Sequence, residues 1–182
     1  AAVLANAHIH GAPIGALEAM SYYVIIATAG HDTTSSSTAG GMLALLEHPE
    51  ELQKVTDNPA LMPLMVDEAI RWTSPVKHFM RYPEQAYELR GKTIEAGSPV
   101  MLLYPSGNRD EEVFDRPQSF LADRRPNRHL AFGHGAHHCL GNLLAKMEIR
   151  FLYEAMFNRM KTFELIGEPR WVESTFVSGL KT

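Results

Sequence analysis

The sequence contains a single cysteine, Cys139, in 182 residues. One cysteine excludes an internal disulfide and is typical of a protein from a reducing compartment, so we expect a cytoplasmic location. The longest apolar run, residues 22–30, is too short to span a bilayer, so no membrane association is expected. The sequence also lacks an excess of positive charge. Its formal net charge of −4 argues against nucleic acid as a partner.

Internal repeats and low-complexity tracts are absent too, and the composition is ordinary for a globular protein, with 45% hydrophobic and 21% charged residues. Few enzymes that enclose a large cofactor are this short. The chain begins without a methionine and stops in the middle of a pattern. We therefore expect residues 1–182 to be a fragment of a longer protein.

The most informative stretch is residues 132–141, FGHGAHHCLG, which holds Cys139 and three glycines. A long helical pattern, residues 142–159, follows it. A thiolate just before a helix is stabilised by the loop amides and by the helix dipole. Such a loop presents one sulfur to one metal. A single protein ligand suits a metal already held by four macrocycle nitrogens, as in haem.

Other interpretations of this loop are open. A lone cysteine is often an inert buried residue. A zinc site could combine Cys139 with the histidines of the region, which are His129, His134, His137 and His138. These ligands crowd one loop, however, and no second cluster faces them. A glycine-rich loop before a helix can also bind phosphate, but this one lacks the Lys-Ser/Thr ending.

Residues 17–46 follow a helical pattern with only two charges, Glu18 and Asp32. A helix that is apolar all round is expected to be central and buried. A buried acid is costly unless it is paired or used, which draws attention to Asp32. The adjacent Thr33 can bond to the carbonyl four residues earlier and locally open the helix. On the residues alone, Asp32 and Thr33 could instead satisfy a buried polar pocket.

The rest of the chain alternates short helices with strand patterns. A helix is predicted over residues 61–72, where Glu68 and Arg71 share a face; their spacing alone favours a surface ion pair of small value. A hairpin is predicted at residues 87–94, and strands are predicted at residues 99–104, 163–165 and 172–177. Residues 108–112 are predicted to form an exposed turn or the start of a helix. The predicted class is mainly α with small β regions (α+β).

The stretch FGHGAHHCLGNLLAKMEI resembles the haem-binding signature of the cytochrome P450 family of haem-thiolate monooxygenases. The matching positions are Phe132, Gly133, Gly135, His137, Cys139, Gly141, Leu144 and Ala145. The resemblance implies the cytochrome P450 fold, of which this chain covers roughly the C-terminal half, in a bacterial soluble form. It also implies haem b as cofactor.

The resemblance implies roles for several residues. Those contacting haem are Cys139, His137, Arg81, Phe132, Gly133, Ala29 and Gly30. Cys139 would bind the iron, and Arg81 and His137 would bind propionates, as buried carboxylates need charge-assisted donors. On the residues alone, Arg81 could be a solvated strand-edge charge, and His137 could form a loop-stabilising hydrogen bond. Asp32 would relay protons and Thr33 would steady the dioxygen.

The implied reaction inserts one atom of dioxygen into a C–H bond of a small apolar substrate. The implied pocket residues are Ile25, Thr28, Val76, His78 and Phe176, together with Ala29. The stretches TSPVKHFMR, YPSGNRDEEVF, PNRHLAFG and ESTFVSGLK are similar to bacterial hydroxylases of the terpineol type, and related sequences act on linear alkanes or steroids. A haem-binding sensor or carrier is the alternative, but it would not need the pair Asp32 and Thr33.

The sequence shows no flavin or nicotinamide motif, so a ferredoxin-type donor is expected to supply two electrons. The resemblance places its docking surface along residues 142–159, with Lys146 as a contact, whereas spacing alone favours a solvated basic stripe of Lys146 and Arg150. It also implies that Glu68 and Arg71 lock structurally onto a later arginine, for which Arg124 is favoured over Arg125.

Overall fold

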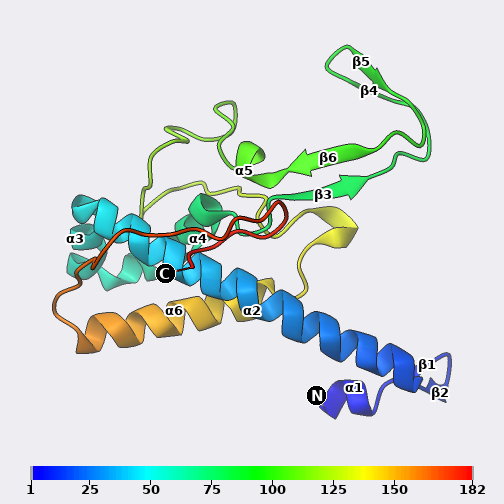
Figure 1. Ribbon diagram of the computed structural model, residues 1–182, viewed down its shortest axis with the longest axis horizontal. Coiled ribbons are helices and arrows are strands. Elements are labelled where there is room, and N and C mark those ends of the chain that lie inside the picture. Colours follow the sequence, from blue (N-terminus) through cyan, green and yellow to red (C-terminus); the bar gives the residue numbers. More distant parts are fainter. Residues whose placement is uncertain (1, 182) are drawn as a thin grey trace.

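The computed structural model describes residues 2–181. The expected fragment spans residues 1–182, so Ala1 and Thr182 lie outside the described residues. Helices dominate the described part (Figure 1). They are α1 Ala2–Ala5, α2 Ala16–Glu47, α3 Pro49–Asp57, α4 Met62–Thr73, α5 Tyr104–Gly107 and α6 Asn142–Arg159, with single turns η1 Pro59–Leu61 and η2 Gly135–His137. The mainly helical class with small sheets is confirmed.

Residues 2–181 contain three small antiparallel sheets of two strands each. They pair β1 His8–Ile9 with β2 Ala12–Pro13, β3 His78–Arg81 with β6 Val100–Leu103, and β4 Tyr87–Leu89 with β5 Lys92–Ile94. The predicted hairpin at residues 87–94 and strand at 99–104 are therefore confirmed. In Figure 1 the β4–β5 hairpin projects away from the helices.

The late strands predicted at residues 163–165 and 172–177 are wrong. This part of the chain contributes only isolated bridges, Val177 with Val76 and Trp171 with Leu180. The physical reason is that its backbone groups bond to residues 75–77 one at a time, through Phe176 O and Ser178 N, instead of forming a continuous ladder.

The core lies where the end of α2 packs against α3, α4 and α6. Its members are Ala44, Leu45, Val55, Met62, Met65, Val66, Ala69, Ile70, Phe120, Ala122, Ile149 and Tyr153. Gly41 permits close helix approach, because a Cβ there would lie 2.4 Å from Ala69 Cβ and 2.6 Å from the Tyr153 hydroxyl. That hydroxyl donates to Thr38 O over 2.6 Å, and burial raises the pKa of Tyr153.

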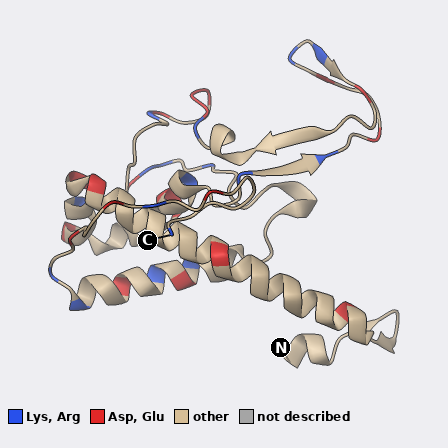
Figure 2. Ribbon diagram, in the orientation of Figure 1, with Lys and Arg blue, Asp and Glu red and all other residues tan. Residues whose placement is uncertain are grey.

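The expectation that α2 is buried along its length is wrong for its first half. The buried residues of α2 begin at Ser37, whereas Leu17, Val24 and Ile25 are exposed. In Figure 1 this half projects beyond the packed helices, and Figure 2 shows little charge on it. Its only charged residues before the core begins are Glu18 and Asp32. The helix is apolar all round, but within residues 2–181 its first half meets only the short α1, and the other helices pack against its second half. No helix within residues 2–181 combines the length and the apolar character needed to cross a membrane.

Candidate functional site

The loop of residues 132–141 closes on itself just before α6. Gly133 and Gly135 adopt left-handed φ angles of +71° and +66°, and a Cβ on Gly133 would lie 3.2 Å from His137 O, so glycine suits both the torsion and the space. Cys139 N donates to Phe132 O over 2.8 Å. The Asn142 side chain, at the start of α6, donates to Cys139 O over 2.7 Å. The backbone of Cys139 is thus fixed on both sides.

The thiol of Cys139 is free and partly exposed. Within residues 2–181, no three His, Cys, Asp or Glu side chains are arranged to hold a metal ion. His129, one of the expected zinc ligands, has its side chain buried, with Nε2 3.5 Å from Asp67 Oδ1. His138 Nδ1 lies 3.4 Å from Gly133 O. The described residues therefore offer a metal one sulfur ligand here and no zinc site.

The ring of Phe132 is surrounded by polar side chains. Its centroid lies 5.6 Å from that of His129 and 6.4 Å from that of His138, and Lys146 Nζ lies 5.7 Å from it. Lys146 Nζ is also 2.6 Å from Asp67 Oδ1 on α4. Burial acts to raise the pKa of Asp67, but the hydrogen bonds from His129 and Lys146 outweigh it and lower that pKa. The expected docking residue Lys146 therefore faces α4, with its charge offset by Asp67.

The other expected haem contacts lie on three elements, β3, η2 and α2. Arg81 ends β3 and is half-exposed, with Nη1 donating to Met80 O over 2.8 Å. His137 belongs to η2 and is exposed, and the loop contact considered for it is made by His138 instead. Ala29 and Gly30 lie on the uncovered part of α2, where a Cβ added to Gly30 meets nothing within 4 Å.

Thr33 makes the bond expected of it, since its Oγ1 donates to Ala29 O over 2.7 Å. Asp32 Oδ1 lies 2.7 Å from His31 Nδ1. The expectation that Asp32 is buried is wrong, because its side chain is 72% exposed on the uncovered half of α2. The acid and the alcohol are adjacent, and the acid is in contact with solvent.

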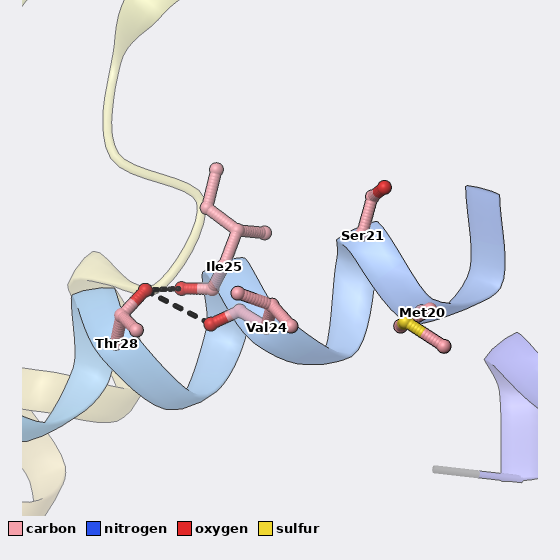
Figure 3. Close-up of a pocket in the computed structure, with 5 residues that line it drawn as sticks. All are labelled: Met20, Ser21, Val24, Ile25 and Thr28. Carbon is pink, nitrogen blue, oxygen red and sulfur yellow. Dashed lines mark hydrogen bonds between the residues drawn. The ribbon is translucent and has the colours of Figure 1, made fainter. Parts of the chain in front are cut away.

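The expected pocket residues fall into two groups. Ile25 and Thr28 line a surface hollow of about 410 Å³ along α2, together with Met20, Ser21 and Val24, and Thr28 Oγ1 donates to Val24 O over 2.9 Å (Figure 3). The second group gathers at β3. There Val76 bridges to Val177, and the ring of Phe176 packs edge-on against that of His78 with centroids 5.8 Å apart.

Glu68, Arg71 and Arg124 meet in a buried network, so the pair on α4 is not a surface ion pair. Arg71 Nε and Nη2 donate to the two Glu68 oxygens over 2.7 Å each, and Arg124 Nε donates to Oε2 over 2.9 Å. Arg71 Nη1 donates onward to Asn108 O over 2.8 Å. Arg124, and not Arg125, is the partner of Glu68.

The structural role of Asn108 was not predicted from the sequence. It was expected in an exposed turn, but it is fully buried. Its Nδ2 donates to Ser74 Oγ over 2.7 Å, and its Oδ1 accepts from Leu130 N over 2.6 Å. Leu130 O in turn accepts from Gly133 N over 2.8 Å. Asn108 thereby connects the Glu68 network to the cysteine loop, and an asparagine beside four charged residues gave no signal of this.

A sequence model described as Cytochrome P450 matches residues 16–170. The chain belongs to the cytochrome P450 family. The match includes the cysteine loop, α2, and Glu68, Arg71 and Arg124. Haem is the cofactor of this family, and monooxygenase is the activity named for some of its members.

Named relatives and relatives with solved structures align with nearly all of this chain. It is 51% identical over 179 residues to Cytochrome P450-terp of a Pseudomonas species, covering 98% of this chain and 42% of that protein. It is 35% identical to linalool 8-monooxygenase of Pseudomonas putida, over 100% of this chain and 45% of that protein. The crystal structure of CYP108D1 from Novosphingobium aromaticivorans superposes on this chain with a TM-score of 0.94 at 47% sequence identity. The superposition covers 99% of this chain and 44% of that one.

Other P450 relatives are named methyl-branched lipid omega-hydroxylase and steroid C26-monooxygenase. The chain spans less than half the length of the relatives it matches.

The residues present fit a haem. Cys139 supplies one free sulfur on a fixed loop, and exposed apolar side chains flank that loop at the start of α6, at Leu143, Leu144 and Met147. A flat apolar group with two carboxylates needs such a surface and charged donors, and His137 in this loop and Arg81 on β3 are residue types that can supply them.

Proposed function

We propose that this chain is the C-terminal part of a longer haem-thiolate monooxygenase that inserts one atom of dioxygen into a C–H bond of a small apolar substrate. The observation that carries the proposal is the single free thiol of Cys139 on a closed glycine loop before α6. The uncovered apolar half of α2 and the relatives' greater length support a longer protein. A haem sensor or carrier is not favoured, because relatives are named as monooxygenases.

In this proposal Cys139 holds the iron as a thiolate, and Arg81 and His137 bind the propionates by charge-assisted hydrogen bonds. When bound, haem supplies the activation of dioxygen, favoured by electron density from the thiolate. The protein fixes the sulfur through the Phe132 carbonyl and the Asn142 side chain. Phe132 and Gly133 would pack beside the group, and Ala29 and Gly30 would leave room for dioxygen.

Asp32 and Thr33 govern proton delivery in this proposal, with Asp32 relaying protons and Thr33 steadying the dioxygen. The Thr33 hydroxyl gives its hydrogen to Ala29 O, which leaves its oxygen lone pairs free to accept a hydrogen bond. Asp32 precedes Thr33 directly, and its Oδ1 lies 2.7 Å from His31 Nδ1, so Asp32 can take up a proton and pass it toward the Thr33 hydroxyl.

We infer that the substrate is a monoterpene alcohol. The name of the linalool 8-monooxygenase and the stretches similar to terpineol hydroxylases support this class. Ile25 and Thr28 on α2, with Val76, His78 and Phe176 at β3, would form a mostly apolar wall with a few polar points. Linear alkanes and steroids are the competing substrate classes.

Substrate-induced spectral shifts of the haem test this inference. We expect linalool and terpineol to shift the Soret band at lower concentration than a linear alkane or a steroid. Tighter binding of the alkane or the steroid would contradict it.

We propose a ferredoxin-type protein as electron donor, docking at the start of α6 in the cytoplasm. Lys146 is the candidate contact, being 37% exposed although Asp67 offsets its charge. The single free cysteine supports a reducing compartment. Lys146→Ala should weaken donor binding more than Lys161→Ala does, and more so at low ionic strength. Equal effects of the two variants would contradict this assignment.

A further inference from the structure

Residues 174–180, here called the C-terminal strap, cross α2 and approach the start of β3 (Figure 1). Lys77 N donates to Phe176 O and Ser178 N donates to Pro75 O, each over 2.8 Å. Val177 forms a bridge with Val76. The backbone of the strap is therefore paired with residues 75–77 over a short length.

The side chain of Lys77 adds a second attachment. Its Nζ donates to Ser174 O over 2.5 Å, joining residues 97 apart in the chain. The contact is partly buried, and a hydrogen bond from an ammonium group is stronger than one between neutral groups. Ser174 Oγ accepts from Phe176 N over 3.3 Å. Lys77 thus holds the turn before Phe176 by its side chain and Phe176 itself by its backbone.

The ring of Phe176 depends on this attachment because it is not enclosed. The residue is 43% exposed, and its ring contacts are edge-on, with centroids 5.8 Å from His78 and 5.4 Å from Phe79. Two edge contacts leave the ring free to shift if its backbone moves. The position of Phe176 is therefore set mainly by the strap.

The other end of the strap is fixed against α2. Gly179 is buried, and a Cβ on it would lie 2.1 Å from Ser36 Oγ and 2.8 Å from Ser36 Cβ. Ser36 follows Thr33 by three residues on α2, so the two lie on one side of the helix. The strap is held at β3 by Lys77 and at α2 by the close approach of Gly179 to Ser36.

We propose that Lys77 is a positioning residue for substrate selectivity. By holding the strap it fixes Phe176 against β3, and so sets which C–H bond of a bound substrate is presented for reaction. This inference rests on the proposed function, because it assumes that Phe176 faces the substrate. Lys77 itself touches the strap and not the substrate.

The test compares Lys77→Met with Lys92→Met in the holoenzyme. Methionine keeps an unbranched apolar stem but lacks the donor, and Lys92 is an exposed lysine on β5. We expect Lys77→Met to keep the thiolate-type band of the reduced carbon monoxide complex, to change the ratio of hydroxylated products and to raise KM several-fold, with a smaller change in kcat. Lys92→Met should match the wild type. A product ratio for Lys77→Met equal to that of Lys92→Met would overturn the proposal.

Hydrogen exchange separates this inference from the proposed function. Amides of residues 174–178 should exchange about tenfold faster or more in Lys77→Met, since one charged hydrogen bond is lost. Unchanged exchange would overturn the attachment by Lys77. A wild type without the thiolate-type band would instead contradict the proposed function, whatever the exchange shows.

Gly179→Ala moves the strap from its other end. The added Cβ must displace the strap from Ser36, so we expect the product ratio to change in this variant as well. Ser36→Gly combined with Gly179→Ala removes the clash and should restore the ratio toward that of Ser36→Gly alone. An unchanged ratio in Gly179→Ala, or no restoration in the double variant, would contradict a role of strap position in selectivity.

Discussion

The Glu68 carboxylate accepts two hydrogen bonds from the Arg71 guanidinium, each 2.7 Å long, and both side chains are fully buried. Two buried charges this close remain ionised only when their remaining donors and acceptors are satisfied. Arg124 and Leu121 N donate to Glu68, and the carbonyls of Asn108, Pro117 and Ser119 accept from Arg71. Asn108 continues the network to Leu130, before the cysteine loop. The pair on α4 therefore supports the loop that carries Cys139.

We predict that Glu68→Gln lowers the free energy of unfolding by about 3–5 kcal/mol, because it leaves two buried arginines without their charge partner. Chemical denaturation of the holoprotein measures this. The control is Glu154→Gln, which breaks the partly exposed pair with Arg150 on α6 and should cost about 1 kcal/mol or less. Equal stability of the two variants would show that the buried Glu68 pair contributes no more to the free energy of unfolding than the partly exposed pair on α6.

Gly41→Ala should destabilise the packing of α2 on α4 and α6 by about 1–3 kcal/mol, because its Cβ would overlap Ala69 and the Tyr153 hydroxyl. Gly30→Ala is the matched control on the same helix. A Cβ there meets nothing within 4 Å, so helix propensity should leave stability unchanged or raise it by up to about 1 kcal/mol. The thermal unfolding temperatures of the two variants measure this difference. A Gly41→Ala variant as stable as the wild type would show that the close approach of the helices at Gly41 does not contribute to stability.

We predict that Thr33→Ala still consumes reducing equivalents but forms peroxide instead of hydroxylated product, because the hydroxyl that steadies dioxygen is removed. Thr38→Ala is the control, as Thr38 on the same helix also donates to the carbonyl four residues earlier, over 2.8 Å. The measurement is product formed per reducing equivalent consumed. Coupling that is equal in the two variants would remove Thr33 from proton delivery.

Local patterns predicted the elements of this fold well. The helix expected at residues 142–159 is α6 with the same bounds, and the hairpin at residues 87–94 is present as β4 and β5. The Thr33 bond to Ala29 was predictable because it lies within one helix. These features depend on residues a few positions apart, which a sequence displays directly.

Features that depend on distant contacts were not predictable from the residues alone. The spacing of Glu68 and Arg71 suggested a surface pair, because Asn108 and Arg124, which help to bury it, lie 37 and 56 residues away from Arg71 and Glu68. Asn108 stood in a charged run and looked exposed. The opposite error occurred on α2, where an apolar pattern indicated burial, but among residues 2–181 the Asp32 side chain is 72% exposed.

Asp67 should make stability depend on pH in the acid range. Its pKa is lowered in the folded protein, so its contribution is fully present above the unfolded value of about 3.9 and is lost as pH falls through the folded pKa. We predict that Asp67→Asn is less stable than the wild type at neutral pH and that the difference shrinks as the pH is lowered through this range. Denaturation at a series of pH values measures it.

The control for Asp67 is Asp123→Asn, which removes a more exposed contact with Lys54. Its difference from the wild type should be small at every pH. A constant stability difference for Asp67→Asn across the acid range would show that the hydrogen bonds from His129 and Lys146 do not lower the pKa of Asp67.

The most direct test of the account concerns the sulfur of Cys139. We predict that the reduced holoprotein with carbon monoxide shows the thiolate-type Soret band, that His138→Ala retains it, and that Cys139→Ala abolishes it. A normal thiolate-type band in Cys139→Ala would contradict the assignment of Cys139 as the iron ligand.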